Sequence, residues 1–245
     1  MTKAIRNNIP EHVKRKVRQR CGFGCVICGH PIYEIDHIVE WSVVKEHKAD
    51  NLTLLCSNHH MEKTKGLLPI EAVIKADSNP FNIKMGQSSP YSLNLSGNKV
   101  MFILGDTKFI SEGKEGETLQ FTPILLGRMP IFNFKIKNGN FYFSSIIFDE
   151  LNKIVLVINQ NELIMNVNNW DIENKGNKFI IRESKGKIIL NMRILVPDTI
   201  CIDSAILYYN GHKVVVKNNI ININGDQIRL SNNTFINNRY GIAIG

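Results

Sequence analysis

Two short pairs of metal-ligating side chains constrain this sequence more than any other feature. Cys25 and Cys28 form the first pair, and Cys56 and His59 form the second, each with two residues between its members. Thiolate and imidazole suit a soft, tetrahedral ion such as zinc, and this spacing lets one turn present two ligands. We therefore expect a closed structural zinc site that joins two segments and performs no chemistry. The alternative is a small core of reduced, buried cysteines.

The composition is that of a folded protein with reduced cysteines. Five cysteines in 245 residues cannot all pair within one molecule. The first residues lack the apolar core of an export signal, so we expect a cytoplasmic protein that uses its cysteines for metal ligation. Cys201 lies in a β-patterned stretch, where we expect it to pack as a small apolar residue. No apolar run approaches the roughly 18 to 20 residues that a membrane span needs, so no membrane association is expected.

Basic residues exceed acidic ones by a formal net charge of +8, which suits a polyanionic partner. One concentration lies in a helix expected to begin at Pro10 and in the residues before it. Its basic residues are Lys3, Arg6, Lys14, Arg15, Lys16, Arg18 and Arg20. They form either a solvated helix face or a phosphate-contacting one; for phosphate contact we select Lys14, Arg15 and Arg18.

The chain divides into two parts with different patterns, which predicts an α+β protein. After the first helix, residues up to about 78 predict strands at 33–39 and 52–55, a helix from a Ser57 cap to about 65, and a helix over 69–76. After Pro80, runs of alternating apolar residues separated by Asn and Gly predict an all-β domain. We place the domains at 1–84 and 91–245, with a hinge over 85–90.

The architecture of the β domain is left with two alternatives. Asn138-Gly139 and Asn210-Gly211 are strong hairpin-turn signals, which favour an antiparallel sandwich or meander. The loosely repeated Asn-rich stretch over 220–238 is also compatible with a β-solenoid. Several acids and one histidine here have no recognisable catalytic spacing; they are Asp149, Glu150, Asp171, Glu173 and His212.

Four further polar residues lie between or beside the two ligand pairs, namely Asp36, His37, Asn51 and His60. Consecutive helical residues diverge by about 100°, so His59 can face the zinc while His60 faces the strand that carries Asp36. Alternation along that strand places Asp36 and His37 on opposite faces unless a bulge re-aims one of them. We expect Asp36, His37 and His60 to converge beside the zinc without binding it.

The order of these residues closely resembles the HNH endonucleases of the ββα-metal class. The resemblance covers about residues 20–66 and leaves the rest of the chain unexplained. It rests on Cys25-x-x-Cys28, Asp36-His37-Ile38, Asn51-Leu52, Leu55-Cys56 and His59-His60-x-x-Lys63-Thr64.

The resemblance implies a role for each matching residue. The two ligand pairs take the structural zinc positions. His37 becomes the general base that activates water, and Asp36 and His60 hold a catalytic Mg²⁺ or Mn²⁺. Asn51 braces the active loop and helps to orient the base, and Lys63 is a candidate phosphate contact. The resemblance therefore implies a small zinc-stapled ββα-metal domain.

The sequence departs from the family pattern at two positions. His59 stands where many relatives have cysteine, an exchange that zinc tolerates. Glu40 stands where proline is common, which loosens the loop and adds a carboxylate. Neither departure removes a catalytic group.

The leading hypothesis is a metal-dependent endonuclease acting on double-stranded DNA, whose β domain selects the target, state or partner. An imidazole titrating near neutrality can take a proton from water, and one divalent ion can neutralise the phosphate. One alternative is a zinc-containing nucleic-acid-binding module without cleavage. Another is a nuclease controlled by a ligand-sensing or homo-oligomerising β domain, as in bacterial defence and restriction proteins, which is an association only.

Overall fold

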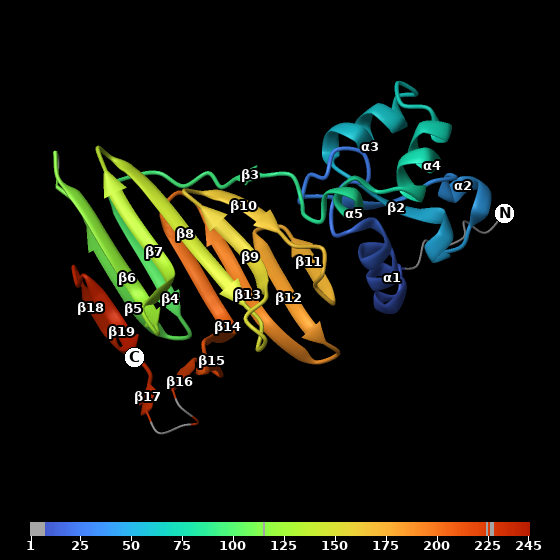
Figure 1. Cartoon of the computed structure of the whole chain (residues 1–245). Coiled ribbons are helices and arrows are strands. Elements are labelled where there is room, and N and C mark those ends of the chain that lie inside the picture. Colours follow the sequence, from blue (N-terminus) through green and yellow to red (C-terminus); the bar gives the residue numbers. More distant parts are fainter. Residues whose placement is uncertain (1–7, 115, 224, 226–227) are drawn as a thin grey trace. The chain divides into compact units, whose positions relative to one another are not determined.

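The computed structural model describes residues 8–114, 116–223, 225 and 228–245, and the chain has a mixed α+β fold with few helices and many strands (Figure 1). It divides into two compact units. Unit 1 comprises Met1–Pro90 and Met165–Glu173, and unit 2 comprises Tyr91–Ile164 and Asn174–Gly245. Lys3 and Arg6 of the basic concentration lie outside the described residues. Within those ranges, no helix combines the length and apolar character that crossing a membrane requires.

Unit 1 contains short helices around one pair of strands. Its elements are α1 (Glu11–Cys21), β1 (Glu34–His37), α2 (Trp41–Val44), the 3-10 helix η1 (Ala49–Asn51), β2 (Leu52–Leu55), α3 (Ser57–Thr64), α4 (Ile70–Ser78) and α5 (Phe81–Met85). The helices and strands predicted up to residue 76 are confirmed. The predicted Ser57 cap is wrong, because Cys56 occupies the N-cap of α3 and Ser57 is its first helical residue.

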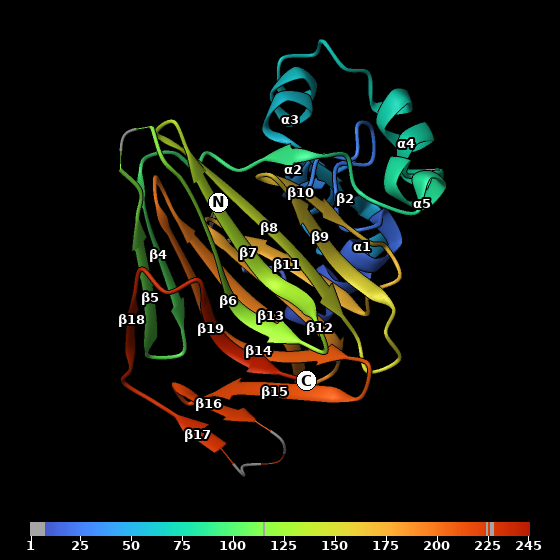
Figure 2. The ribbon, with the colours of Figure 1, turned by 60° about the vertical axis from the view of Figure 1, so that its left-hand side comes forward.

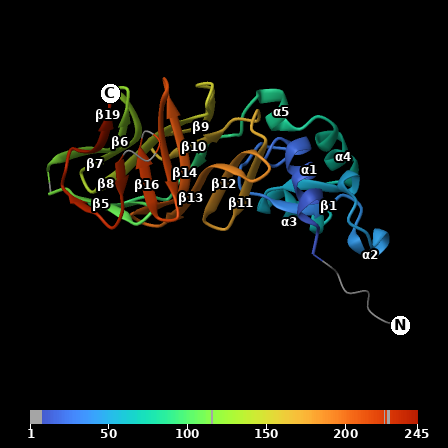
Figure 3. The ribbon, with the colours of Figure 1, turned by 90° about the horizontal axis from the view of Figure 1, so that it is seen from below.

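The core of unit 1 forms where the two-stranded sheet meets the helices. β1 and β2 are antiparallel, with Asp36 opposite Thr53 and His37 opposite Leu52. All four residues of β2 are buried, so this strand is covered on both faces. Helices α1 and α3 pack against it (Figure 3). From α1, Val17 contributes to the same core.

A distant segment completes unit 1. The Asp171 carboxylate accepts hydrogen bonds from Arg18 Nε at 2.8 Å and from Arg18 Nη2 at 2.9 Å. The two side chains are 0% and 3% exposed. Burial lowers the pKa of Arg18, but its hydrogen bonds to Asp171 and Glu11 outweigh burial and raise it, so the guanidinium stays charged. Tyr33 donates a hydrogen bond to the Ile172 carbonyl at 3.1 Å.

Unit 2 is built almost entirely from strands in two sheets. A seven-stranded sheet has the order β19-β6-β7-β8-β9-β10-β3. A ten-stranded sheet runs from β11 to β17 in chain order and adds β4, β5 and β18 beside β14. The strands of the first sheet are β3 (Tyr91–Ser92), β6 (Thr118–Leu126), β7 (Met129–Lys137), β8 (Asn140–Phe148), β9 (Ile154–Asn159), β10 (Glu162–Met165) and β19 (Tyr240–Ile244). Those of the second are β4 (Lys99–Leu104), β5 (Thr107–Glu112), β11 (Asp171–Lys175), β12 (Lys178–Ser184), β13 (Lys187–Leu195), β14 (Thr199–Tyr209), β15 (His212–Lys217), β16 (Ile220–Ile223), β17 (Ile228–Leu230) and β18 (Thr234–Ile236).

The two sheets pack face to face as a sandwich. Phe102 of β4 lies against Phe132 and Phe134 of β7, with ring centroids 4.9 and 5.2 Å apart. These rings are fully buried and belong to different sheets, so they form part of the layer between them. Cys201 is buried and free, as predicted.

The Asn-rich turns decide between the two predicted architectures. Asn138-Gly139 joins β7 to β8 and Asn210-Gly211 joins β14 to β15, each with positive φ at both positions. That conformation closes two-residue hairpins, as predicted. Asn218-Asn219 does the same between β15 and β16 (Figure 2). The solenoid alternative over 220–238 is wrong, because the turns that the structure describes there close antiparallel hairpins or lead into β18, which pairs with β5.

Candidate functional site

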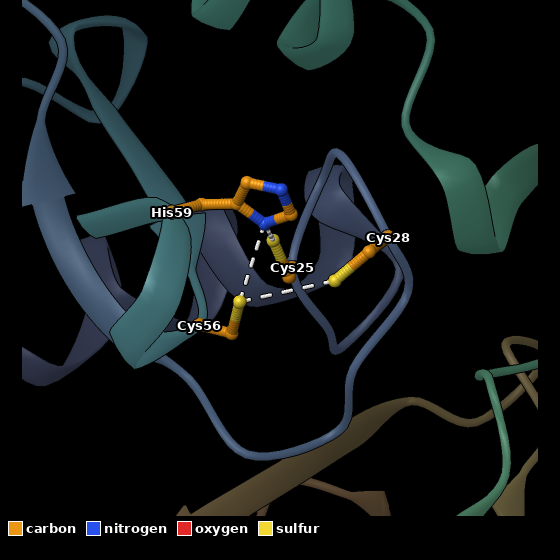
Figure 4. Close-up of side chains that lie close together, drawn as sticks. All are labelled: Cys25, Cys28, Cys56 and His59. Atoms are coloured by element: carbon orange, nitrogen blue, oxygen red, sulfur yellow. Dashed lines mark hydrogen bonds between the residues drawn. The ribbon is translucent and has the colours of Figure 1, made fainter. Parts of the chain in front are cut away.

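The two predicted ligand pairs come together in unit 1. Cys25 and Cys28 lie in the turn after α1, Cys56 caps α3, and His59 extends from the first turn of α3 (Figure 4). The four potential ligand atoms all lie within 4.8 Å of one another. All cysteines of the chain are free. These side chains form a candidate zinc site.

The distances within this cluster fit a tetrahedral zinc ion. His59 Nδ1 lies 3.3 Å from Cys25 Sγ and 3.2 Å from Cys56 Sγ, and the sulfurs of Cys28 and Cys56 are 3.8 Å apart. Thiolates about 2.3 Å from a tetrahedral zinc lie about 3.8 Å from each other, and a thiolate and an imidazole nitrogen lie about 3.5 Å apart. The donor set therefore suits zinc in chemistry and in spacing.

The first ligand turn depends on a glycine. The Cys25 N–H donates to the His30 carbonyl at 3.0 Å, and the Gly29 N–H donates to the Cys25 carbonyl at 2.8 Å. Gly29 has a φ of +75°, and a Cβ there would overlap Phe81 of α5. Only glycine meets both requirements. The close approach of α5 therefore shapes the turn that presents Cys25 and Cys28.

The thiols of this turn influence each other. Hydrogen bonding with the Cys28 thiol lowers the pKa of the Cys25 thiol to about 4, and the same contact raises the pKa of Cys28. One thiolate and one thiol thus lie side by side when no cation is bound. A bound cation favours the thiolate form of each ligand.

A second polar cluster lies between β1 and α3. His60 Nε2 is 3.5 Å from Asp36 Oδ1, and His60 Nδ1 is 3.5 Å from Glu34 Oε2. Lys63 Nζ donates to Asp36 Oδ2 at 2.8 Å and to the His37 carbonyl at 2.6 Å. Glu34 and Asp36 share this face because they are two residues apart on a strand. As expected, His60 faces the strand while His59 faces the zinc ligands.

The donors of this second cluster suit a divalent cation. Cis ligand atoms about 2.1 Å from one octahedral ion lie about 3.0 Å apart, so the 3.5 Å between Asp36 Oδ1 and His60 Nε2 requires only a small movement. Asp36 is 14% exposed and His60 35% exposed, so the pair is open to solvent on one side. Carboxylate and imidazole are ligands that Mn²⁺ accepts, and the carboxylate suits Mg²⁺.

The imidazole of His37 lies in a different environment from Asp36 and His60. His37 is 2% exposed. Its Nε2 is 3.3 Å from His47 Nδ1, and its ring is in edge contact with Trp41, with centroids 5.4 Å apart. The backbone of His37, in contrast, joins the second cluster through Lys63. Asp36 and His60 therefore lie together, and the printed side-chain contacts of His37 are with the loop after β1.

Asn51 braces that loop from η1. Its Oδ1 accepts a hydrogen bond from the Val39 N–H, and its Nδ2 donates to the Val39 carbonyl, each at 2.9 Å. The Ile38 N–H donates to the Asn51 carbonyl at 2.9 Å. These three bonds hold the chain directly after Asp36 and His37. Glu40, where the family pattern has proline, takes the N-cap position of α2.

The predicted phosphate contacts of α1 differ in their exposure. Arg18 is buried against Asp171 and Glu11, so its guanidinium serves the interior of unit 1 and cannot reach a phosphate. Arg15 Nε lies 3.3 Å from Asp171 Oδ2, and the side chain is 25% exposed. Lys14 is 30% exposed and 3.8 Å from Glu11. Of the three selected residues, Lys14 and Arg15 remain available at the surface.

Three residues of the site escaped the sequence pattern. Glu34 had a local signal, because it lies two positions before Asp36 and so shares its strand face. His47 and Trp41 lie in a loop without periodicity, and no spacing rule connects them with His37. Their positions follow from the way in which Asn51 folds that loop back.

Comparison with known proteins supports one segment of the chain. No curated protein and no solved structure matches it. The family model for HNH endonuclease matches residues 19–66, which include both ligand pairs and the four residues Asp36, His37, Asn51 and His60. The resemblance seen in the sequence is thereby confirmed on this segment. Residues 19–66 are an HNH endonuclease segment, which suggests a function that acts on nucleic acid.

Proposed function

We propose that unit 1 is a metal-dependent endonuclease that hydrolyses phosphodiester bonds in double-stranded DNA. The observation that carries the proposal is the pairing of Asp36 on β1 with His60 on α3, 3.5 Å apart inside the HNH segment. A carboxylate and an imidazole at this spacing can share one Mg²⁺ or Mn²⁺. The adjacent candidate zinc site holds α3 to the turn after α1, and so fixes one of the two ligands.

His37 is the proposed general base. Its imidazole takes a proton from water, the water oxygen attacks phosphorus, and the bond from phosphorus to the 3′-oxygen breaks. A divalent cation held by Asp36 and His60 supplies charge neutralisation on the phosphate and on the departing oxygen. One base and one such pair of ligands cut one strand. The expected first product is therefore a nick.

Lys63 and Asn51 position these groups. The Lys63 ammonium holds Asp36 Oδ2 and the His37 carbonyl, which leaves one of its three N–H donors for a phosphate oxygen. Asn51 fixes the chain after His37 through both polar atoms of its amide. Lys14 and Arg15 on α1 are the proposed backbone contacts that add affinity without reading sequence.

A supercoiled plasmid tests the proposal. The zinc-loaded full chain with Mg²⁺ or Mn²⁺ should convert supercoiled plasmid to the nicked form, and chelation of the divalent ion should stop it. His37→Ala should lower the rate by about 100- to 10,000-fold, the usual contribution of a general base. His212→Ala, which replaces a histidine of unit 2, is the matched control and should leave the rate unchanged. Equal rates for the parent and His37→Ala would refute the role of His37.

A zinc-braced nucleic-acid-binding module without cleavage is the second candidate. The observation in its favour is the burial of His37, which is only 2% exposed. Such a module would retard DNA in a gel and leave the plasmid supercoiled with every divalent ion. Nicking that depends on His37 excludes it.

A further inference from the structure

A stack of aromatic rings surrounds the proposed base. His47 lies parallel to Trp41, with ring centroids 4.5 Å apart and an interplanar angle of 24°. Its centroid is 5.3 Å from that of His37, and its Nδ1 is 3.3 Å from His37 Nε2. Both Trp41 and His47 are half-buried. One face of His47 is thus held by an indole while one edge meets the nitrogen of His37.

The chemistry of imidazole limits how these two rings can be protonated. A neutral histidine carries one N–H donor and one nitrogen acceptor. Because His37 Nε2 faces His47, the nitrogen of His37 that can take a proton from water is Nδ1. His37 then carries its own proton on Nε2 and donates it to His47 Nδ1, which accepts. His47 in turn carries its proton on Nε2.

We propose that His47 is a positioning residue for the base. Its Nδ1 accepts the hydrogen bond from His37 Nε2 and thereby keeps His37 Nδ1 unprotonated and oriented for water. The stacked Trp41 holds the plane of His47. This inference rests on the proposed nuclease function and adds to it the group that selects the tautomer of His37.

Burial strengthens the contact. His37 is 2% exposed, so water competes little for its Nε2. A hydrogen bond in such an environment is stronger than in water, and a missing partner costs correspondingly more. The contact can therefore bias His37 toward one tautomer, as the orienting acid does for the histidine of serine proteases.

Two substitutions separate the hydrogen bond from ring packing. His47→Phe keeps an aromatic ring against Trp41 and removes the nitrogen. His47→Asn removes the ring and keeps an acceptor oxygen at the place of Nδ1. We expect His47→Phe to lower kcat for plasmid nicking by about 10- to 100-fold with little change in KM, and His47→Asn to retain most of the activity. Full activity in His47→Phe, or equal losses in both variants, would overturn the proposal.

An NMR measurement tests the same contact without cleavage. In the zinc-loaded parent at one neutral pH, long-range ¹⁵N–¹H correlations should place the ring proton of His37 on Nε2, with a downfield proton signal. This signal should disappear in His37→Ala, move upfield in His47→Phe and stay downfield in His47→Asn. A proton on His37 Nδ1 in the parent, or an unmoved signal in His47→Phe, would refute the positioning role. Failure of the parent to nick DNA would refute the nuclease function, whereas the spectrum decides the hydrogen bond independently.

Discussion

Loss of the Asp171 carboxylate should destabilise unit 1 far more than its distance along the chain suggests. The Arg18–Asp171 pair has side chains 3% and 0% exposed, joined at 2.8 and 2.9 Å. Removal of one partner from a buried pair costs about 3 to 5 kcal/mol, because the other charge stays buried without compensation. Glu11 Oε1 remains 2.7 Å from Arg18, but its side chain is 47% exposed. For Asp171→Asn we therefore expect a loss of about 3 kcal/mol, at the lower end of that range.

Tryptophan fluorescence gives a readout specific to unit 1. The chain has two tryptophans, Trp41 and Trp170, and both belong to unit 1. In a unit of this size a change of 1 kcal/mol moves the midpoint by about 4 to 8 °C, so Asp171→Asn should lower the fluorescence-detected Tm by at least about 12 °C. The matched control is Asp203→Asn. Asp203 accepts two hydrogen bonds from Arg193 at 2.7 and 2.8 Å, but these side chains are 31% and 39% exposed.

The control pair fixes what would refute this reasoning. Exposed ion pairs contribute about 0 to 1 kcal/mol, so Asp203→Asn should change the circular-dichroism midpoint of the β-sheet by only a few degrees. A double variant, Arg18→Met with Asp171→Leu, should recover much of the loss, because it removes both buried charges together. If Asp171→Asn costs no more than Asp203→Asn, or if the double variant is worse than either single one, the buried pair is not what stabilises unit 1.

Two further predictions concern metal and DNA. The purified chain should contain one zinc per molecule by elemental analysis; Cys56→Ser should lose it and unfold at a lower temperature, whereas Cys201→Ser should keep it, and retention by both variants would contradict the assigned ligands. Lys14→Ala should reduce the slope of log binding constant against log salt by about 0.9 through loss of one phosphate contact, with Lys187→Ala in unit 2 as the control. An unchanged slope in Lys14→Ala would remove α1 from the DNA interface.

Features set by neighbouring residues were predictable from the sequence. The spacing of Cys25 and Cys28 and the Asn-Gly turns each depend on a few consecutive residues, and the structure has them as expected. The opposite directions of His59 and His60 also follow from the angle between consecutive helical residues. These local rules describe how the ligands of the candidate site reach one another.

Features set by residues distant in the chain were not predictable. Arg18 counted as part of a basic helix, yet it lies between Val17 and Cys21 on the buried side of α1. A charge at that place needs a buried partner, but nothing in the sequence marks Asp171 as that partner among the acids of the β region. The contact of His47 with His37 likewise depends on the path of a loop and not on a period.

The discontinuity of unit 1 limits how this chain can be cut or recombined. A fragment ending at residue 90 would keep the whole HNH segment but leave the Arg18 guanidinium without its carboxylate. The smallest fragment with both joins residues 1–90 to 165–173, and the Ser88 N–H already meets the Met165 carbonyl at 2.9 Å, so a short artificial bridge would suffice. By the same geometry, a chimera that takes its C-terminal half from another protein needs an acid in place of Asp171. Residues 18 and 171 should therefore be inherited together.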